Sequence, residues 1–397
     1  MNGLQEYTNE AVELLQKIVS IPSYSFGERD VADFLHEYLL EKQKMVWTAK
    51  SMAEPPFTVK RIANNLILYS PEKTKDVSLN TVLFTAHIDT VKESDSYTVN
   101  PFGGEIAEGR LYGLGSNDDG GCVVCSIAAF LHYIDERERG NAPAKNGGKF
   151  QRINPVVVLG AEEERSGVNG MQLIVKELEK MDIHPCYAIV GEPTGLKAAV
   201  AERGLLVIDG TAHGVSGHAA RNEGVNALYI AIDDINKMRS YEFAKKSPLM
   251  GDVKLTVTQI KSGSAHNVIP DKCEFTVDIR TTEQYSNSEI TELLQKEVKS
   301  ELKARNLNNK SSATKENSLL FKILEKGSIE SFISPTTSDW MRIPYQAIKI
   351  GPGESSRSHK ADEYITIKEI EAGIECYIKI IDLLEEILEE ENGNTME

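Results

Sequence analysis

Residues 81–91 read TVLFTAHIDTV, a short apolar run that ends abruptly in polar residues. Three other apolar runs also lack helical spacing and are bounded by polar or turn residues: residues 65–69, 155–160 and 188–190. Such runs are typical of strands buried on both faces. Residues 9–20 and 28–42 show the apolar spacing of helices, so both kinds of element occur along the chain. We predict an α/β fold with a mostly parallel sheet and helices on both faces.

The pattern changes after residue 200. Three segments alternate apolar and polar residues with the period of antiparallel strands, namely residues 205–213, 253–260 and 273–280. Apolar spacing predicts helices over about residues 222–239 and 287–305. This order predicts a small α+β sandwich of the ferredoxin-like kind, inserted in the larger domain. The predicted domains are residues 1–200 with 310–397, and an inserted domain of residues 201–309.

Length and composition favour a globular protein of two or three domains. Of the 397 residues 41% are hydrophobic, and the formal net charge of −16 disfavours a nucleic-acid partner, because phosphate binding needs clustered Lys and Arg. No run approaches the roughly 18 apolar residues of a membrane span. The first residues lack the basic and apolar regions of a secretory signal, so we expect a cytoplasmic protein that makes no membrane contact.

Cysteine is sparse and odd in number, with five residues, so a disulfide framework is not expected. Cys122 and Cys125 form a C-x-x-C pair that begins the apolar run CVVCSIAAFL. We favour buried small residues on a helix over a redox motif.

Candidate ligands follow the predicted strands. His87 and Asp89 come after the strand at residues 81–86, and their side chains point the same way because strand side chains alternate. A metal-bound imidazole commonly donates its other N–H to a carboxylate. The H-x-D pattern alone is weak, and a purely structural role is the alternative. Asp118 and Asp119 lie in LYGLGSNDDGG, which either presents oxygen ligands or forms an ordinary solvated turn.

Glutamates follow two further strands. VVVLGAEEERSG places Glu162 to Glu164 directly after an apolar run, and YAIVGEPT places Glu192 after another. A run of charges is usually a solvated face. In open α/β sheets, however, ligands bind beyond the carboxyl ends of the strands. A further stretch, IGPGESSRSHKADEY, carries His359 in a Gly/Ser-rich loop.

In this order, the elements resemble those of the co-catalytic zinc aminoacylase and exopeptidase family, which includes acetylornithine deacetylase, succinyl-diaminopimelate desuccinylase and glutamate carboxypeptidase. GSNDDGG, EEE, GEPT, GHAARNEGVNA, NVIPDKCEFTVDIR, TTSD and GPG…SHKADEY occur in family order, so the resemblance covers nearly the whole chain. Within the family, the chain is most similar to acetylornithine deacetylases of the Bacteroidetes type, where GLGSND, GEPT and GPG-x-SSRSH recur. The chain departs from many relatives by lacking a lysine after Asp119 and by reading Arg-Ser-Gly after Glu164.

The resemblance implies two divalent metal ions, with zinc preferred and cobalt or manganese as substitutes. His87 and Glu192 would hold one ion, and Glu164 and His359 the other. Asp118 would bridge both through its two oxygens.

The resemblance also assigns catalytic roles. Glu163 would be the general base, Asp89 would orient His87, and the peptide bond after Asp118 would be cis. His218 would donate to the oxyanion, from its own chain or from a partner subunit. Its alternative is an ordinary surface-loop histidine. The inserted domain would serve as a lid and as the interface of a homodimer.

Substrate contacts are implied for Asn267, Arg280 and Arg357. An arginine can bind a carboxylate through two nitrogens. For Arg280, an ion pair with a nearby acid on the sheet is an equal alternative. Ser338 and Asp339 match a T-S-D element that would support the site.

We therefore expect a hydrolase that removes the acyl group from a small N-acyl amino acid, with N-acetyl- or N-succinyl-ornithine or -citrulline of arginine biosynthesis as substrate. Succinyl-diaminopimelate desuccinylase and a di- or tripeptidase are rivals that keep the same metal site. A non-enzymatic scaffold is disfavoured, because the complete set of expected ligands and the expected base are present.

Overall fold

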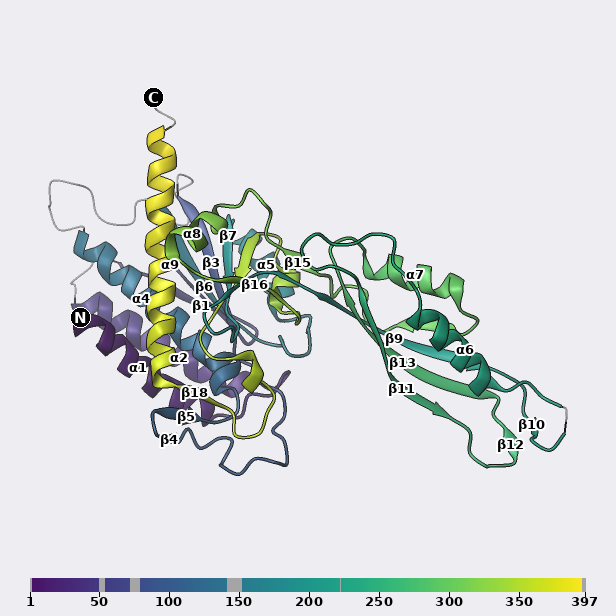
Figure 1. Ribbon diagram of the computed structural model, residues 1–397. Coiled ribbons are helices and arrows are strands. Elements are labelled where there is room, and N and C mark those ends of the chain that lie inside the picture. Colours follow the sequence, from purple (N-terminus) through teal and green to yellow (C-terminus); the bar gives the residue numbers. More distant parts are fainter. Residues whose placement is uncertain (1, 50–53, 72–78, 141–151, 222, 395–397) are drawn as a thin grey trace. The chain divides into compact units, whose positions relative to one another are not determined.

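The computed structural model describes residues 2–49, 54–71, 79–140, 152–221 and 223–394. The chain divides into two compact units (Figure 1). Unit 1 comprises Met1–Val200, Thr314–Phe332 and Ser338–Glu397, and unit 2 comprises Ala201–Ala313 and Ile333–Thr337. The positions of the units relative to one another are not determined, so each is described by itself.

The main sheet is parallel at its centre. Its strands are β1 (Thr58–Ile62), β2 (Asn65–Tyr69), β3 (Asn80–His87), β6 (Ile153–Gly160), β7 (Tyr187–Val190), β8 (Ala198–Glu202), β15 (Ser312–Ala313), β16 (Ser331–Ser334) and β17 (Gln346–Lys349). They lie in the order β1-β2-β6-β3-β7-β17-β8-β15, and β16 pairs with β8. The neighbours β6, β3, β7 and β17 are parallel, whereas β1, β2, β8 and β15 join by antiparallel pairs.

Two apolar cores lie on opposite faces of this sheet. Val82 and Phe84 of β3 belong to one core and Leu83 to the other, because strand side chains alternate between faces. Helices that contribute to the first core are α1 (Asn2–Val19), α2 (Arg29–Ala49), α4 (Gly121–Gly140), α8 (Leu319–Gly327) and α9 (Ile367–Asn394). The second core is covered by α5 (Met171–Lys180). The predicted α/β class, with helices on both faces, is confirmed.

Helix α4 explains the C-x-x-C pair. Cys122 and Cys125 lie in its first turns, where both are buried and free of disulfides. The interpretation as buried helical residues therefore agrees with the structure.

Unit 2 contains a four-stranded antiparallel sheet in the order β11-β13-β9-β14. Its elements follow the chain as β9 (Gly204–His213), α6 (Ala227–Arg239), β11 (Lys254–Ser262), β13 (Lys272–Thr281), α7 (Asn287–Glu297) and β14 (Glu301–Ala304). The strands bury alternate side chains, such as Leu206 and Ile208, with side chains of both helices. This is the strand–helix–strand–strand–helix–strand order of a ferredoxin-like sandwich.

One predicted element is wrong. The helix expected over residues 287–305 ends at Glu297, and residues 301–304 form β14, which pairs with β9. Residues 295–305 are mostly good helix formers. Hydrogen bonding to the edge of β9 that β13 leaves unpaired outweighs their intrinsic preference for a helix.

Smaller elements complete both units. They are β4 (Ile106–Ala107), β5 (Arg110–Tyr112), β10 (Gly217–His218), β12 (Val268–Ile269), β18 (Tyr364–Thr366), a π-type turn η1 (Ser116–Gly120) and the 3₁₀ turns η2 (Asp339–Arg342) and η3 (Ser355–Arg357). Throughout the described part of the chain, no helix has the length and apolar character needed to cross a membrane.

Candidate metal centre

The candidate ligands follow the parallel strands at the centre of the main sheet. His87 is the last residue of β3 and lies opposite Gly160, the last residue of β6. Glu163 and Glu164 follow β6, and Glu192 follows β7. Because parallel strands end at the same edge of a sheet, these side chains gather there.

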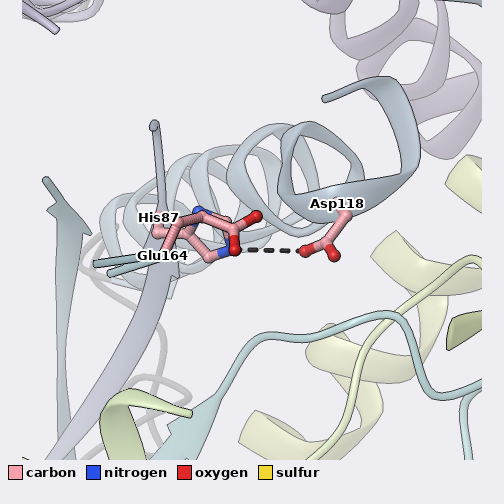
Figure 2. Close-up of side chains that lie close together, drawn as sticks. All are labelled: His87, Asp118 and Glu164. Atoms are coloured by element: carbon pink, nitrogen blue, oxygen red, sulfur yellow. Dashed lines mark hydrogen bonds and ion pairs between the residues drawn. The ribbon is translucent and has the colours of Figure 1, made fainter. Parts of the chain in front are cut away.

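Asp118 stands between two histidines. Its Oδ1 lies 3.2 Å from Nε2 of His87, and its Oδ2 lies 3.8 Å from Nε2 of His359. The same His359 nitrogen is 2.9 Å from Oε1 of Glu164. Figure 2 shows the side chains of His87, Asp118 and Glu164 converging on one place. Each oxygen of Asp118 thus faces a different imidazole, as a bridging carboxylate would. The peptide bond that joins Asp118 to Asp119 is cis, as the resemblance implied.

Two groups of donor atoms are close enough to hold a cation. One is His87, Asp118 and Glu164, and the other is His87, Glu163 and Glu192; within each group, the donor atoms lie within 4.8 Å of one another. Carboxylate and imidazole donors suit zinc and other divalent metals. The side chains present therefore offer donors for two neighbouring metal ions, with His87 common to both groups and Asp118 in the first.

Burial and the crowding of carboxylates in this cluster raise the pKa values of several of them. Burial and the nearby carboxylates raise the pKa of Glu163 well above its usual range. Burial also raises the pKa of Glu192 well above its usual range, with a further contribution from Asp118, and raises that of Asp119 to about 7. Divalent cations would remove this repulsion.

Asp89 contacts His87 mainly through its main-chain oxygen, whereas a contact through its carboxylate was expected. Nδ1 of His87 lies 2.9 Å from the main-chain oxygen of Asp89 but 3.5 Å from its carboxylate. The carboxylate instead accepts the N–H groups of Glu163 and Glu164 at 3.0 and 3.2 Å, and the hydroxyl of Ser25 at 2.7 Å. Asp89 therefore orients His87 mainly through its carbonyl, and its carboxylate fixes the loop that carries the two glutamates.

The three consecutive glutamates have different surroundings. The carboxylate of Glu162 accepts the main-chain N–H of Asn169 at 3.0 Å and its side-chain amide at 2.9 Å. Glu162 is thus turned into its own loop, whereas Glu163 and Glu164 belong to the two donor groups. This separation sets Glu162 apart from the two groups of candidate donors.

Glu363 was missed by reasoning from the sequence. It is buried, and its carboxylate accepts the N–H groups of Asn117 and Asp118 at 2.9 Å each and that of Gly115 at 3.2 Å. These three hydrogen bonds fix the main chain of the turn that carries Asp118. Burial and the charge of Asp118 raise the pKa of Glu363 to about 8. An acid four residues after His359, in SHKADEY, was the available signal.

Lys349 was missed as well. It is the last residue of β17, is 1% exposed, and pairs in register with Val190, two residues before Glu192. Its positive charge opposes the rise in the pKa of Glu192. A lysine inside the apolar run AIKIG was the signal, because lysine is almost never fully buried unless it is paired.

Comparisons with known proteins agree with this arrangement. The model of peptidase family M20/M25/M40 matches residues 83–383. The chain belongs to this family. The predicted resemblance to zinc aminoacylases and exopeptidases is therefore confirmed at family level.

Named relatives of this M20/M25/M40 family member include succinyl-diaminopimelate desuccinylase 2 of Ruegeria sp. (strain TM1040), which is 30% identical over 52% of this chain and 52% of that protein. The match thus spans about half the length of that relative. Among solved structures, a tripeptidase of Staphylococcus aureus covers 96% of this chain and 99% of its own, with a TM-score of 0.69 and 18% identity. A dinuclear metal-binding peptidase from Bacillus subtilis has a TM-score of 0.66 and 13% identity, with 96% and 99% covered. At these identities the structures establish the shared fold.

His218 and Asn267 lie together in unit 2. His218 pairs with Val268, the residue after Asn267, where β10 meets β12. The N–H of Ala219 donates to the main-chain oxygen of Asn267 at 3.0 Å. Both predicted residues are exposed. Their roles toward substrate remain predictions.

The two predicted substrate-binding arginines have carboxylate partners within the chain. Nε and an outer nitrogen of Arg280 donate to Asp278 at 2.9 and 3.1 Å, which is the alternative that the sequence left open. Both outer nitrogens of Arg357 donate to Glu369 at 2.9 Å, and its guanidinium lies over the ring of Tyr364. A substrate carboxylate would have to compete with these pairs.

The T-S-D element lies near the predicted base. Ser338 caps η2 through a hydrogen bond from the N–H of Trp340 at 3.3 Å. Asp339 is buried, and its charge contributes to the raised pKa of Glu163.

Proposed function

We propose that this M20/M25/M40 family member is a two-metal amidohydrolase that removes the acyl group from an N-acyl amino acid. The first substrates to consider are N-acetyl- or N-succinyl-ornithine and -citrulline, which would place the enzyme in arginine biosynthesis. The observation that carries the proposal is the position of Asp118, whose two oxygens face His87 and His359 separately.

The chain's own residues divide into two sets of ligands. His87 and Glu192 would hold one ion, Glu164 and His359 the other, and Asp118 both. When bound, the ions would polarise the amide carbonyl and lower the pKa of the attacking water. We prefer zinc, and cobalt or manganese could replace it.

Glu163 is proposed to take a proton from that water and to deliver it to the leaving amine. Burial raises the pKa of Glu163, and a carboxylate with a raised pKa is a stronger base for the first step. The hydrogen bond from its N–H to Asp89 at 3.0 Å holds its main chain in place.

His218 is proposed to donate to the oxyanion. Its Nδ1 accepts the N–H of Ala220 at 3.1 Å, so the neutral ring carries its proton on Nε2. That tautomer is the one able to donate a hydrogen bond outward.

Two rival substrates keep the same metal centre. A desuccinylase acting on diaminopimelate is favoured by the names of curated relatives, and a peptidase by the name of a structural neighbour. The acylornithine proposal rests instead on GLGSND, GEPT and the SSRSH stretch of this chain.

A substrate panel tests the proposal. Zinc-loaded, cobalt-loaded and chelator-treated protein would be given N-acetyl and N-succinyl derivatives of ornithine, citrulline and diaminopimelate, together with di- and tripeptides, while free amine is measured. We expect chelator-sensitive release from an N-acylornithine or N-acylcitrulline. Release only from succinyl-diaminopimelate or only from peptides would move the function to that rival, and no release from any substrate would contradict a hydrolase.

A further inference from the structure

A pocket of about 380 Å³ opens beside the metal centre in unit 1. Glu164 and His359, two of the candidate ligands, form part of its wall. The rest comes from residues 24–25 and 90–92 and from Arg165. A substrate held at the metal centre can therefore extend directly into this space.

The wall formed by residues 24–25 and 90–92 is fixed by hydrogen bonds. The N–H of Thr90 donates to the carbonyl of Ser23 at 2.8 Å, and the N–H of Ser25 donates back to Thr90 at 3.2 Å. The hydroxyl of Tyr24 donates to Glu93 at 2.5 Å. This part of the pocket wall is thus built on segments tied to each other next to Asp89.

The charge of the pocket is opposite to that of the chain. Arg165 and Lys92 line it, and Glu164, the one acid in the described lining, is hydrogen bonded to His359. The whole chain carries a net charge of −16, so two cations at one pocket are a local exception. In the part of the chain that the structure describes, Arg165 makes no hydrogen bond or ion pair. Its guanidinium is available to an anionic ligand.

We propose that Arg165 and Lys92 form a subsite for a carboxylate at the end of the acyl arm of the substrate. The inference rests on the proposed amidohydrolase function. It selects a dicarboxylic acyl group of the succinyl type over acetyl, because an acetyl methyl group offers nothing for two cations to bind. An arginine can engage such a carboxylate through two parallel hydrogen bonds.

The test compares two acyl groups on one amine. The ratio of kcat/KM for N-succinylornithine to that for N-acetylornithine would be measured for the zinc-loaded protein and for Arg165→Ala, Arg165→Lys and Lys92→Ala. Hydrogen bonds to charged groups predict that Arg165→Ala lowers this ratio about 10-fold to 100-fold. Arg165→Lys should keep part of it. Lys176→Ala is the matched control, because this exposed lysine of α5 lies outside the pocket lining and its removal changes the net charge equally.

Equal losses for both acyl groups would overturn the proposal, since they would place the cations against the α-carboxylate that both substrates share. An unchanged ratio in all variants would overturn it too. Calorimetric binding of free succinate separates this inference from the proposed function. If the protein cleaves no N-acyl amino acid, the proposed function fails, but succinate binding that weakens in Arg165→Ala and not in Lys176→Ala would still support the subsite. Succinate binding unaffected by Arg165→Ala would reject it.

Discussion

At the scale of the residue, neighbouring side chains with the same chemistry have different tasks. Glu162 accepts two hydrogen bonds from Asn169, whereas Glu163 lies among carboxylates that raise its pKa. Asp362 and Glu363 divide in the same way. The first accepts the N–H groups of Thr98 and Val99, and the second grips the Asp118 turn. Position in the fold, and not residue type, separates the members of each pair.

Glu163→Gln is expected to lower kcat by about 10²- to 10⁴-fold, because an amide cannot take up the proton. Metal content, measured by mass spectrometry of the dialysed protein, should stay at the wild-type value. Glu162→Gln is the control and should keep kcat within several-fold. A fall of similar size in both variants, or in Glu162→Gln alone, would show that the base is assigned to the wrong residue.

Glu363→Gln is expected to weaken cobalt binding by about 10- to 100-fold, because its NH₂ group would face main-chain N–H donors that position Asp118. A cobalt titration followed by visible absorption measures this without turnover. Asp362→Asn is the control. Asp362 accepts as many hydrogen bonds as Glu363 does, but from Thr98 and Val99, so this variant should bind cobalt like the wild type. Two cobalt ions bound to Glu363→Gln with wild-type affinity would refute the positioning role.

At the scale of the element, the start of α9 joins distant parts of the chain. The N–H and hydroxyl of Thr366 donate to the carboxylate of Glu369 at 2.8 Å each, and the N–H of Glu369 donates to the hydroxyl oxygen of Thr366 at 3.1 Å, which together form a capping box. Arg357 of η3 adds two hydrogen bonds to the same carboxylate. One glutamate therefore anchors both the helix and the loop that leads to His359.

Replacing Glu369 should lower the free energy of unfolding by an amount that depends on pH. Burial opposes ionisation, but the hydrogen bonds from Arg357 and Thr366 outweigh it and lower the pKa of Glu369. A lowered pKa in the folded state stabilises the fold above the unfolded value of about 4.3, and this contribution disappears as the pH falls through the folded value. Glu369→Ala should lose about 1 kcal/mol at pH 7 and progressively less in acid.

Thermal unfolding from pH 7 to pH 3 would measure this loss. Glu375→Ala is the control, because Glu375 lies exposed on the same helix. A deficit of Glu369→Ala that is the same at every pH would show that the lost contribution is packing and not charge.

At the scale of the whole molecule, unit 2 has surface features suited to assembly. In unit 2, β11 is an edge strand that exposes half of Ile260, and α6 exposes Tyr229. Edge strands with apolar side chains readily pair with another chain. We propose that these features form the interface of the homodimer that the resemblance implies.

Light scattering after size exclusion should therefore find a dimer, and Ile260→Asp should shift it to monomer. Ile106→Asp, which alters an exposed isoleucine of β4 in unit 1, should leave the dimer intact. A wild-type protein that is monomeric and fully active would contradict both the interface and the need for a partner subunit.

Local patterns along the chain are enough to predict the class of fold and the places of the candidate ligands. Largely apolar runs such as residues 81–86 predict buried strands because they have no wet face and no helical spacing, and polar residues at their ends predict a site at the shared edge. The capping box of α9 can also be predicted from the sequence, because Thr366 and Glu369 are only three residues apart. These patterns each span only a few neighbouring residues, so they can be recognised without knowledge of the fold.

Which side chains meet depends on contacts between segments that are distant in the chain. Glu363 and the N–H of Asn117 are 246 residues apart in the chain, so no local pattern joins them. The ion pair of Arg357 with Glu369, the burial of Lys349 and the strand that replaces the end of the helix predicted over residues 287–305 likewise depend on neighbours brought by folding. Burial and charge compensation arise from packing distant segments together, and a single sequence specifies these contacts only through the structure that it forms.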